Sequence, residues 1–197
     1  MKDFISTKNL NFTFGNCKDC DANCCHGIYG TLFSQILKEE FVHVYKNFPI
    51  LFIFGKELNF IKPVILLTNG IDKCPYLNDY KCSIYENRPT VCRTYPLSPN
   101  IDNIIYIDSS CPQVNKGKDF LIQNNEIKKD SFKNLVFEEY QDKYIQTHFE
   151  FNTLNKKDFK LLFNINNTSF FVYKGEEDSS YLQFHKKSLK NLDKLFY

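Results

Sequence analysis

Cysteine is the residue that points most directly to chemistry in this sequence. The chain of 197 residues has eight cysteines, and none lies beyond position 111. A thiolate is a strong, soft metal ligand, and clustered thiolates in proteins hold zinc or iron–sulfur clusters. We therefore take all eight as candidate metal ligands: Cys17, Cys20, Cys24, Cys25, Cys74, Cys82, Cys92 and Cys111.

The redox compartment decides between metal ligands and disulfides. The start of the sequence shows no apolar run and no small-residue cleavage site, so we expect no signal peptide and a cytoplasmic protein. Thiols are kept reduced in the cytosol, where clustered cysteines bind metal or carry out redox chemistry. A secreted disulfide domain is the weaker alternative. Buried structural cysteines are another, but four cysteines within residues 17–25 do not suit it.

The spacing of the first cysteine block suggests how its members bind. Cys17 and Cys20 are separated by two residues, so both can bind one metal from a single turn of backbone. Cys24 and Cys25 are adjacent, and neighbouring side chains point apart in helices and strands. We therefore expect one of this pair to serve a second site, to bridge, or to stay a free thiol. His26 is a weaker candidate, because a histidine in a loop is more often simply solvated.

Two features favour an iron–sulfur cluster of the 4Fe-4S type, with zinc as the alternative. Zinc ribbons use two C-x2-C pairs, whereas this chain has one, and Cys74 and Cys111 are each followed by proline as in ferredoxin-type sequences. A four-thiolate cluster is negatively charged, and several cations lie beside the cysteines in the sequence: Lys18, Lys73, Lys81, Arg88 and Arg93.

The arginines are informative because the chain has only two of them against 23 lysines. Arginine offers a rigid planar fork of donors that lysine lacks. We expect Arg88 and Arg93 to support the cofactor. Arg88 would anchor the start of a short helix through backbone carbonyls or Glu86, and Arg93 would face the thiolates.

The elements between the two cysteine blocks must bring them together. Apolar spacings of three and four predict an amphipathic helix over residues 31–48. Two apolar runs, 50–54 and 60–67, predict strands that can pair as a hairpin. Asn78-Asp79 predicts the turn of a small hairpin, and Pro89 the start of a short helix.

The sequence after the last cysteine has a different character. A polar linker over 113–125 is the candidate boundary. Beyond it the patterns predict helices over 126–151 and 156–164, a strand over 168–174 and a terminal helix.

We therefore expect an α+β fold in two parts. Residues 1–115 would form a small cysteine-rich metal-binding domain of short strands and helices. Residues 116–197 would form a mainly helical accessory segment that contains a strand.

Composition argues against other classes of function. The net charge is only +2 with scattered lysines, and no apolar run approaches the ~20 residues of a membrane span, so we expect neither nucleic-acid nor membrane binding. No catalytic arrangement stands out. Glu39 and Glu40 fit a solvated helix face.

The cysteine blocks also match a known pattern. The first has Phe14 ahead of Cys17, Cys20 and Cys24-Cys25; the second contains Cys74-Pro75, Cys82-Ser83-Ile84-Tyr85 and Arg88-Pro89-Thr90-Val91-Cys92-Arg93. This pattern resembles the CxxCxxCC cysteine-cluster family (YkgJ-type), whose members are zinc- or iron-chelating domain proteins. The likeness covers roughly residues 12–112. Three residues rather than two separate Cys20 from Cys24, which leaves open which of Cys24 and Cys25 takes the family's ligand position.

The resemblance implies metal binding more firmly than it implies an activity. We predict a metal-binding protein whose cluster is structural or redox-active. A related cysteine cluster occurs in flagellin lysine N-methylases, so a protein-modifying enzyme is one alternative, although no Gly-rich methyltransferase loop is present. A zinc-stabilised interaction module, with the C-terminal segment as the surface for a protein partner, is the other.

Overall fold

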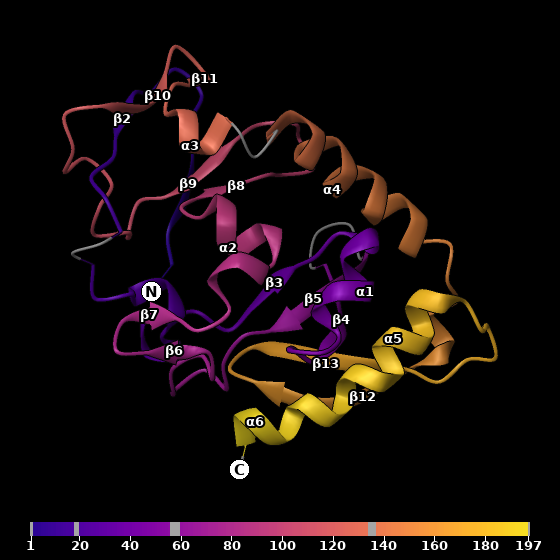
Figure 1. Cartoon of the computed structure of the whole chain (residues 1–197). Helices are drawn as coiled ribbons and strands as arrows, with labels where there is room; N and C mark the ends of the chain where they lie inside the picture. Colours follow the sequence, from indigo (N-terminus) through magenta and orange to yellow (C-terminus); the bar gives the residue numbers. More distant parts are fainter. Residues whose placement is uncertain (1, 18–19, 56–59, 134–136, 197) are drawn as a thin grey trace.

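The computed structural model describes residues 2–17, 20–55, 60–133 and 137–196. Within these ranges short helices and short strands alternate along the chain, which confirms the predicted α+β class (Figure 1). None of the helices in these ranges combines the length and apolar character needed to cross a membrane.

An antiparallel sheet of five strands forms the centre of the fold, in the order β12-β13-β4-β5-β3. The predicted hairpin is confirmed, because β4 and β5 pair with Ile50 opposite Ile65 and Phe54 opposite Ile61. Alternate residues of β4 enter two different hydrophobic cores, so both faces of the strand are covered. The strands are β3 (Phe33–Gln35), β4 (Ile50–Phe54), β5 (Ile61–Leu66), β12 (Phe159–Ile165) and β13 (Thr168–Tyr173).

The predicted helix over residues 31–48 is wrong. The segment holds strand β3, a 3-10 turn η3 (Lys38–Glu40) and a single helical turn α1 (Phe41–Val44). Residues of β3 pair with the edge of β5, with Ser34 opposite Ile65. This strand pairing outweighs the helical spacing, because the backbone groups of residues 33–35 find their partners in the sheet.

The C-terminal prediction is confirmed in part. Strand β13 and the terminal helical region are present, the latter as α5 (Ser180–Ser188), η6 (Leu189–Leu192) and α6 (Asp193–Phe196). The helix predicted over 156–164 is wrong, since a 3-10 turn η5 (Lys156–Asp158) leads directly into strand β12. Four apolar residues of β12 lie at every second position, as in a strand: Phe159, Leu161, Phe163 and Ile165. The register with β13 shifts around the additional apolar residue Leu162.

The helix predicted over 126–151 is shorter than expected, and the polar linker is partly structured. The helical parts are α3 (Asp130–Lys133) and α4 (Phe137–Phe151), and residues 134–136 lie outside the described ranges. Residues 126–127 belong instead to β11 (Glu126–Ile127), which pairs with β10 (Phe120–Gln123). Strand β10 also pairs with β2 (Phe12–Thr13), so the predicted linker contains part of a sheet.

Four of the cysteines lie in short elements outside the central sheet, and the other four lie in the irregular segments beside them. The first block contains 3-10 turns η1 (Asn23–Cys25) and η2 (Gly27–Tyr29). The predicted small hairpin and short helix are both present, as strands β6 and β7 and helix α2. A separate sheet has the order β1-β9-β8. Bounds are β1 (Phe4–Ser6), β6 (Leu77–Asn78), β7 (Lys81–Cys82), η4 (Tyr85–Asn87), α2 (Thr90–Thr94), β8 (Leu97–Ser98) and β9 (Tyr106–Asp108).

The central sheet takes strands from both sides of the boundary predicted at residue 115. Phe171 of β13 lies opposite Phe52 of β4, and helices α5 and α6 run beside this sheet (Figure 1). The division of the chain at residue 115 stays a prediction.

Candidate metal centre

The adjacent cysteines of the first block lie in a 3-10 turn. Ala22 enters the turn with a left-handed backbone (φ 52°), and the Cys25 N–H donates to the Ala22 carbonyl at 2.8 Å. The sulfurs of Cys24 and Cys25 are only 3.9 Å apart, so the two adjacent side chains do not point away from each other as expected.

The two cysteine blocks meet through their backbones. The Cys74 N–H donates to the Cys25 carbonyl at 2.7 Å, and the Gly27 N–H donates to the Asp72 carbonyl at 2.8 Å. Gly27 is required at this contact, since a Cβ there would lie 2.5 Å from the Ile71 nitrogen. The segment that carries Cys74 is thereby fixed beside the adjacent cysteine pair.

The hairpin β6–β7 and helix α2 bring two further thiols to the same region. Cys82 lies opposite Leu77 in the hairpin, and the Leu77 N–H donates to the Cys74 carbonyl at 2.9 Å. Cys92 on α2 and Cys25 both contact the core cluster that contains Cys74. Burial, with smaller contributions from the thiols of Cys82 and Cys24, raises the pKa of Cys74 to about 11. Burial also raises the pKa of Cys92, as do the same neighbouring thiols and that of Cys74.

Cys17 and Cys111 are neighbours as well. Cys111 is buried in the core cluster that contains Phe14 and Val114, which form a β-bridge. The Gly15 N–H donates to the Gln113 carbonyl at 3.0 Å, so the chain reaches Cys17 from beside Cys111. Burial raises the pKa of Cys17, and the thiols of Cys24, Cys111 and Cys20 add to the effect.

Arg88 is the arginine whose charge acts on these thiols. Its guanidinium lowers the pKa values of Cys17 and Cys92, against the larger effect of burial. The Arg88 Nε donates to the Tyr85 carbonyl at 2.9 Å, and the guanidinium carbon lies 3.5 Å from the centre of the Tyr85 ring. Arg93 is exposed in the last turn of α2, and its role opposite the thiolates stays a prediction. Lys73 and Lys81 are exposed, and Lys18 lies outside the described residues.

Asp108 supports the Cys111 loop and was not found from the sequence. Burial alone would raise the pKa of this fully buried carboxyl, but hydrogen bonds from Ser110 and from the Asp3 N–H lower it. Tyr95 donates to its Oδ2 at 2.8 Å, and Lys2 forms an ion pair with the same oxygen at 3.2 Å. The Cys111 N–H donates to the Asp108 carbonyl at 3.1 Å. One feature of the sequence could have indicated this role: Asp108 ends an apolar strand and precedes Cys111 by three positions.

Glu40 is a second residue whose role the sequence concealed. Its Oε1 accepts a hydrogen bond of 2.7 Å from the Thr90 N–H, at the start of the helix that carries Cys92. Its Oε2 accepts a hydrogen bond of 3.0 Å from the Leu37 N–H. The interpretation as a solvated helix face is therefore wrong for Glu40, whereas Glu39 is exposed. An acidic side chain at a helix start satisfies N–H groups that have no partner within the helix.

The thiols are neighbours without forming a closed site. Among the residues that the structure describes, no three His, Cys, Asp or Glu side chains are grouped as a metal ion requires. Metal binding would therefore have to draw the thiolates inward.

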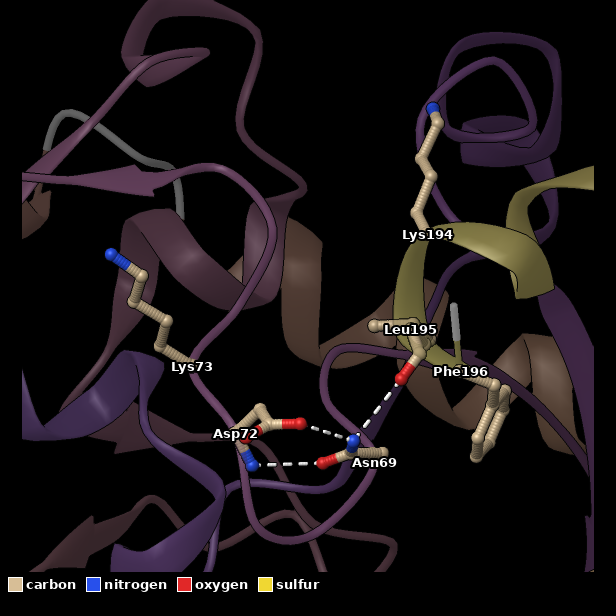
Figure 2. A pocket seen from close by; sticks show the side chains of 6 residues that line it. All are labelled: Asn69, Asp72, Lys73, Lys194, Leu195 and Phe196. Carbon is tan, nitrogen blue, oxygen red and sulfur yellow. Dashed lines mark hydrogen bonds between the residues drawn. The ribbon is translucent and has the colours of Figure 1, made fainter.

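A cavity of about 320 Å³ lies next to the segment before Cys74. Figure 2 shows Asn69 there, donating to Asp72 at 2.6 Å and to the Leu195 carbonyl of α6 at 3.1 Å. These hydrogen bonds connect helix α6 to residues 69–72, which lead into the second cysteine block. No cysteine lines this cavity.

The backbone contacts thus bring the two cysteine blocks side by side. A family model described as "CxxCxxCC: Putative zinc- or iron-chelating domain" matches residues 16–112. The matched residues contain all eight cysteines, so this part of the chain is similar to the CxxCxxCC family. Comparisons with curated proteins and with solved structures found no match.

Proposed function

We propose that this chain is a cytoplasmic protein that holds an iron–sulfur cluster of the 4Fe-4S type through thiolates from both cysteine blocks, in a structural or redox role. The main support for this proposal is the contact between the two cysteine blocks, where the Cys74 N–H donates to the Cys25 carbonyl at 2.7 Å. The candidate ligands come from residues 17–25 and from four positions between 74 and 111. Because the ligands come from distant segments, the free energy of metal binding would also stabilise the fold.

The charge balance of the region supports a bound cation. Thiolates that are close together and partly buried repel one another, and the charge of Arg88 opposes this at Cys17 and Cys92. Iron or zinc would supply the remaining positive charge when bound. The thiols must lose protons to ligate, so the apparent metal affinity is expected to rise with pH.

Zinc is the second candidate, and one distance favours it. Four sulfurs placed tetrahedrally around zinc at about 2.3 Å lie about 3.8 Å from one another. The 3.9 Å between the sulfurs of Cys24 and Cys25 is close to that value. The case for iron–sulfur is the single C-x2-C pair and the prolines after Cys74 and Cys111.

Anaerobic purification with analysis of iron, zinc and acid-labile sulfide tests the proposal. The expected result is iron with a matching amount of sulfide, together with visible absorption that a reductant bleaches. Zinc without acid-labile sulfide would show that the site binds zinc rather than an iron–sulfur cluster. A folded protein free of both metals would overturn the proposal, and a sample exposed to air serves as the control for cluster loss.

A further inference from the structure

We infer that Cys24 and Cys25 form a site of reversible oxidation, at which a low-molecular-weight disulfide converts the two thiols into a disulfide between adjacent residues. Their sulfurs are 3.9 Å apart, so the two side chains are in direct contact. Both residues keep partial exposure to solvent, which a reacting molecule requires. The inference goes beyond the proposed metal site, because it concerns these thiols when no metal holds them.

The peptide unit between the two cysteines is held at both of its polar groups. Its carbonyl, that of Cys24, accepts a hydrogen bond of 2.9 Å from the Thr31 hydroxyl. Its N–H, that of Cys25, donates to the Ala22 carbonyl at 2.8 Å. The two side chains therefore extend from an anchored backbone, and rotation of the side chains is enough to bring the sulfurs together.

The geometry of adjacent cysteines makes such a disulfide easy to reverse. The peptide bond between Cys24 and Cys25 is trans, so their Cα atoms are about 3.8 Å apart. Most disulfides join Cα atoms that are about 4.4–6.8 Å apart, and deviations from this range strain the bond. Strained disulfides are reduced more easily than relaxed ones. The bond should therefore form and reopen as the surrounding ratio of thiol to disulfide changes.

The oxidation consists of two thiol–disulfide exchanges. One thiolate of the pair attacks a disulfide RSSR, which breaks the S–S bond of RSSR and releases RS⁻. The second thiolate attacks the protein sulfur of this mixed disulfide and releases the second RS⁻. The two cysteines lose two protons and two electrons, and RSSR is reduced to two RSH. The second attack joins neighbouring sulfurs within one molecule, so it should be faster than attack on another RSSR.

A disulfide at this pair would also remove both residues from metal binding. Cysteine binds metal as the thiolate, and a sulfur bonded to another sulfur carries no such charge. Bound metal and oxidation of the pair would therefore exclude each other. This consequence alone rests on the proposed function.

Treatment of the full-length chain with oxidised glutathione, after removal of metal by a chelator, tests the inference. The remaining thiols are alkylated, and the chain is digested without reduction for tandem mass spectrometry. The expected peptide has lost two hydrogen atoms at Cys24 and Cys25, and dithiothreitol should restore them. Alkylation of both residues, stable glutathione adducts or bonds to other cysteines would overturn the inference. Metal analysis of the untreated chain tests the proposed function separately.

Two substitutions in the metal-free chain identify the oxidised pair. Cys25→Ser should abolish the loss of two hydrogen atoms, whereas Cys20→Ser, in the same cysteine block, should leave it unchanged. A disulfide that persists in Cys25→Ser would overturn the inference. The chain as purified with its metal should resist the same treatment. Equal oxidation with and without metal would uphold the oxidation site and remove both residues from the set of ligands.

Discussion

Arg88 combines charge with fixed geometry at the cysteine blocks. Its Nε–H bond to the Tyr85 carbonyl and its position over the Tyr85 ring hold the guanidinium where it acts on Cys17 and Cys92. Lysine would keep the charge but lose the planar fork and the stacking. These contacts explain why position 88 is an arginine in a chain that has 23 lysines and only two arginines.

The substitution Arg88→Lys should weaken metal binding modestly. A cation–π contact at an exposed site is worth about 0.5–1 kcal/mol, so the dissociation constant should rise about twofold to fivefold. Competition with a chromophoric chelator measures the change. Lys190→Arg is the control, because Lys190 is exposed in η6 and follows the last cysteine by 79 positions. Equal effects of both substitutions would show that Arg88 has no special position.

His185 links stability to pH at a site far from the thiols. It is fully buried, accepts from the Tyr173 N–H through Nε2 at 3.2 Å, and donates from Nδ1 to the Ile50 carbonyl at 2.7 Å. Burial lowers its pKa from 6.5 to about 4. The unfolded chain therefore takes up a proton at a higher pH than the folded chain does.

The contribution of His185 should be complete above pH 6.5 and lost as the pH falls to about 4. The 2.5-unit difference corresponds to about 3 kcal/mol in the free energy of unfolding. Chemical denaturation across this pH range measures it, as the difference between the unaltered chain and His185→Gln. His43→Gln, at an exposed position, should leave the profile unchanged. Parallel profiles for the unaltered chain and His185→Gln would contradict the assignment.

At the scale of elements, Glu40 connects the central sheet region to the helix of Cys92. The substitution Glu40→Ala removes the acceptor of the Thr90 N–H and should cost about 1–2 kcal/mol of stability. It should also lower metal retention, because α2 positions Cys92. Glu39→Ala is the control, since Glu39 is exposed and forms only a surface ion pair with Lys143. Thermal unfolding with metal analysis compares the two, and a larger loss in Glu39→Ala would contradict this role.

The sequence predicted the elements whose signals are local. The apolar runs of β4 and β5, the Asn78-Asp79 turn and the helix after Pro89 are all present in the structure. The segment 31–48 was mispredicted because its strand forms through pairing with β5, about thirty residues further along. The bond between Glu40 and Thr90 spans fifty positions, so no spacing rule could reveal it. The cysteines predicted a metal, but the 3.9 Å between the sulfurs of Cys24 and Cys25 depends on side-chain orientations that residue spacing does not determine.

At the scale of the whole molecule, the last third of the chain supports the sheet beside the cysteine blocks. The Ser188 hydroxyl accepts from the Ile50 N–H at 2.8 Å, and Asn191 donates to the Tyr45 carbonyl at 2.8 Å. Strand β13 covers the edge of β4. All candidate ligands nevertheless precede residue 115, so metal binding and folding need not have the same boundary.

A chain of residues 1–115 should have all the ligands but an incomplete sheet. Without residues 116–197, the edge of β4 has no strand beside it and apolar side chains on both faces of β4 become exposed to solvent. We therefore expect this chain to aggregate when expressed alone. Co-expression with residues 116–197 should restore a folded, metal-containing complex. Measurement of metal per chain and of oligomeric state decides this. A monodisperse chain of residues 1–115 with full metal content would instead show two independent units.

The central claim is that thiols from both cysteine blocks hold metal and that the metal stabilises the fold. Metal content and thermal unfolding, measured on the same samples of the unaltered chain, Cys17→Ser and Cys92→Ser, test it most directly. Each substitution should lower the metal content and reduce Tm by about 5–10 °C, because the ligands join distant segments. Full metal content and an unchanged Tm in either variant would contradict the claim for that block.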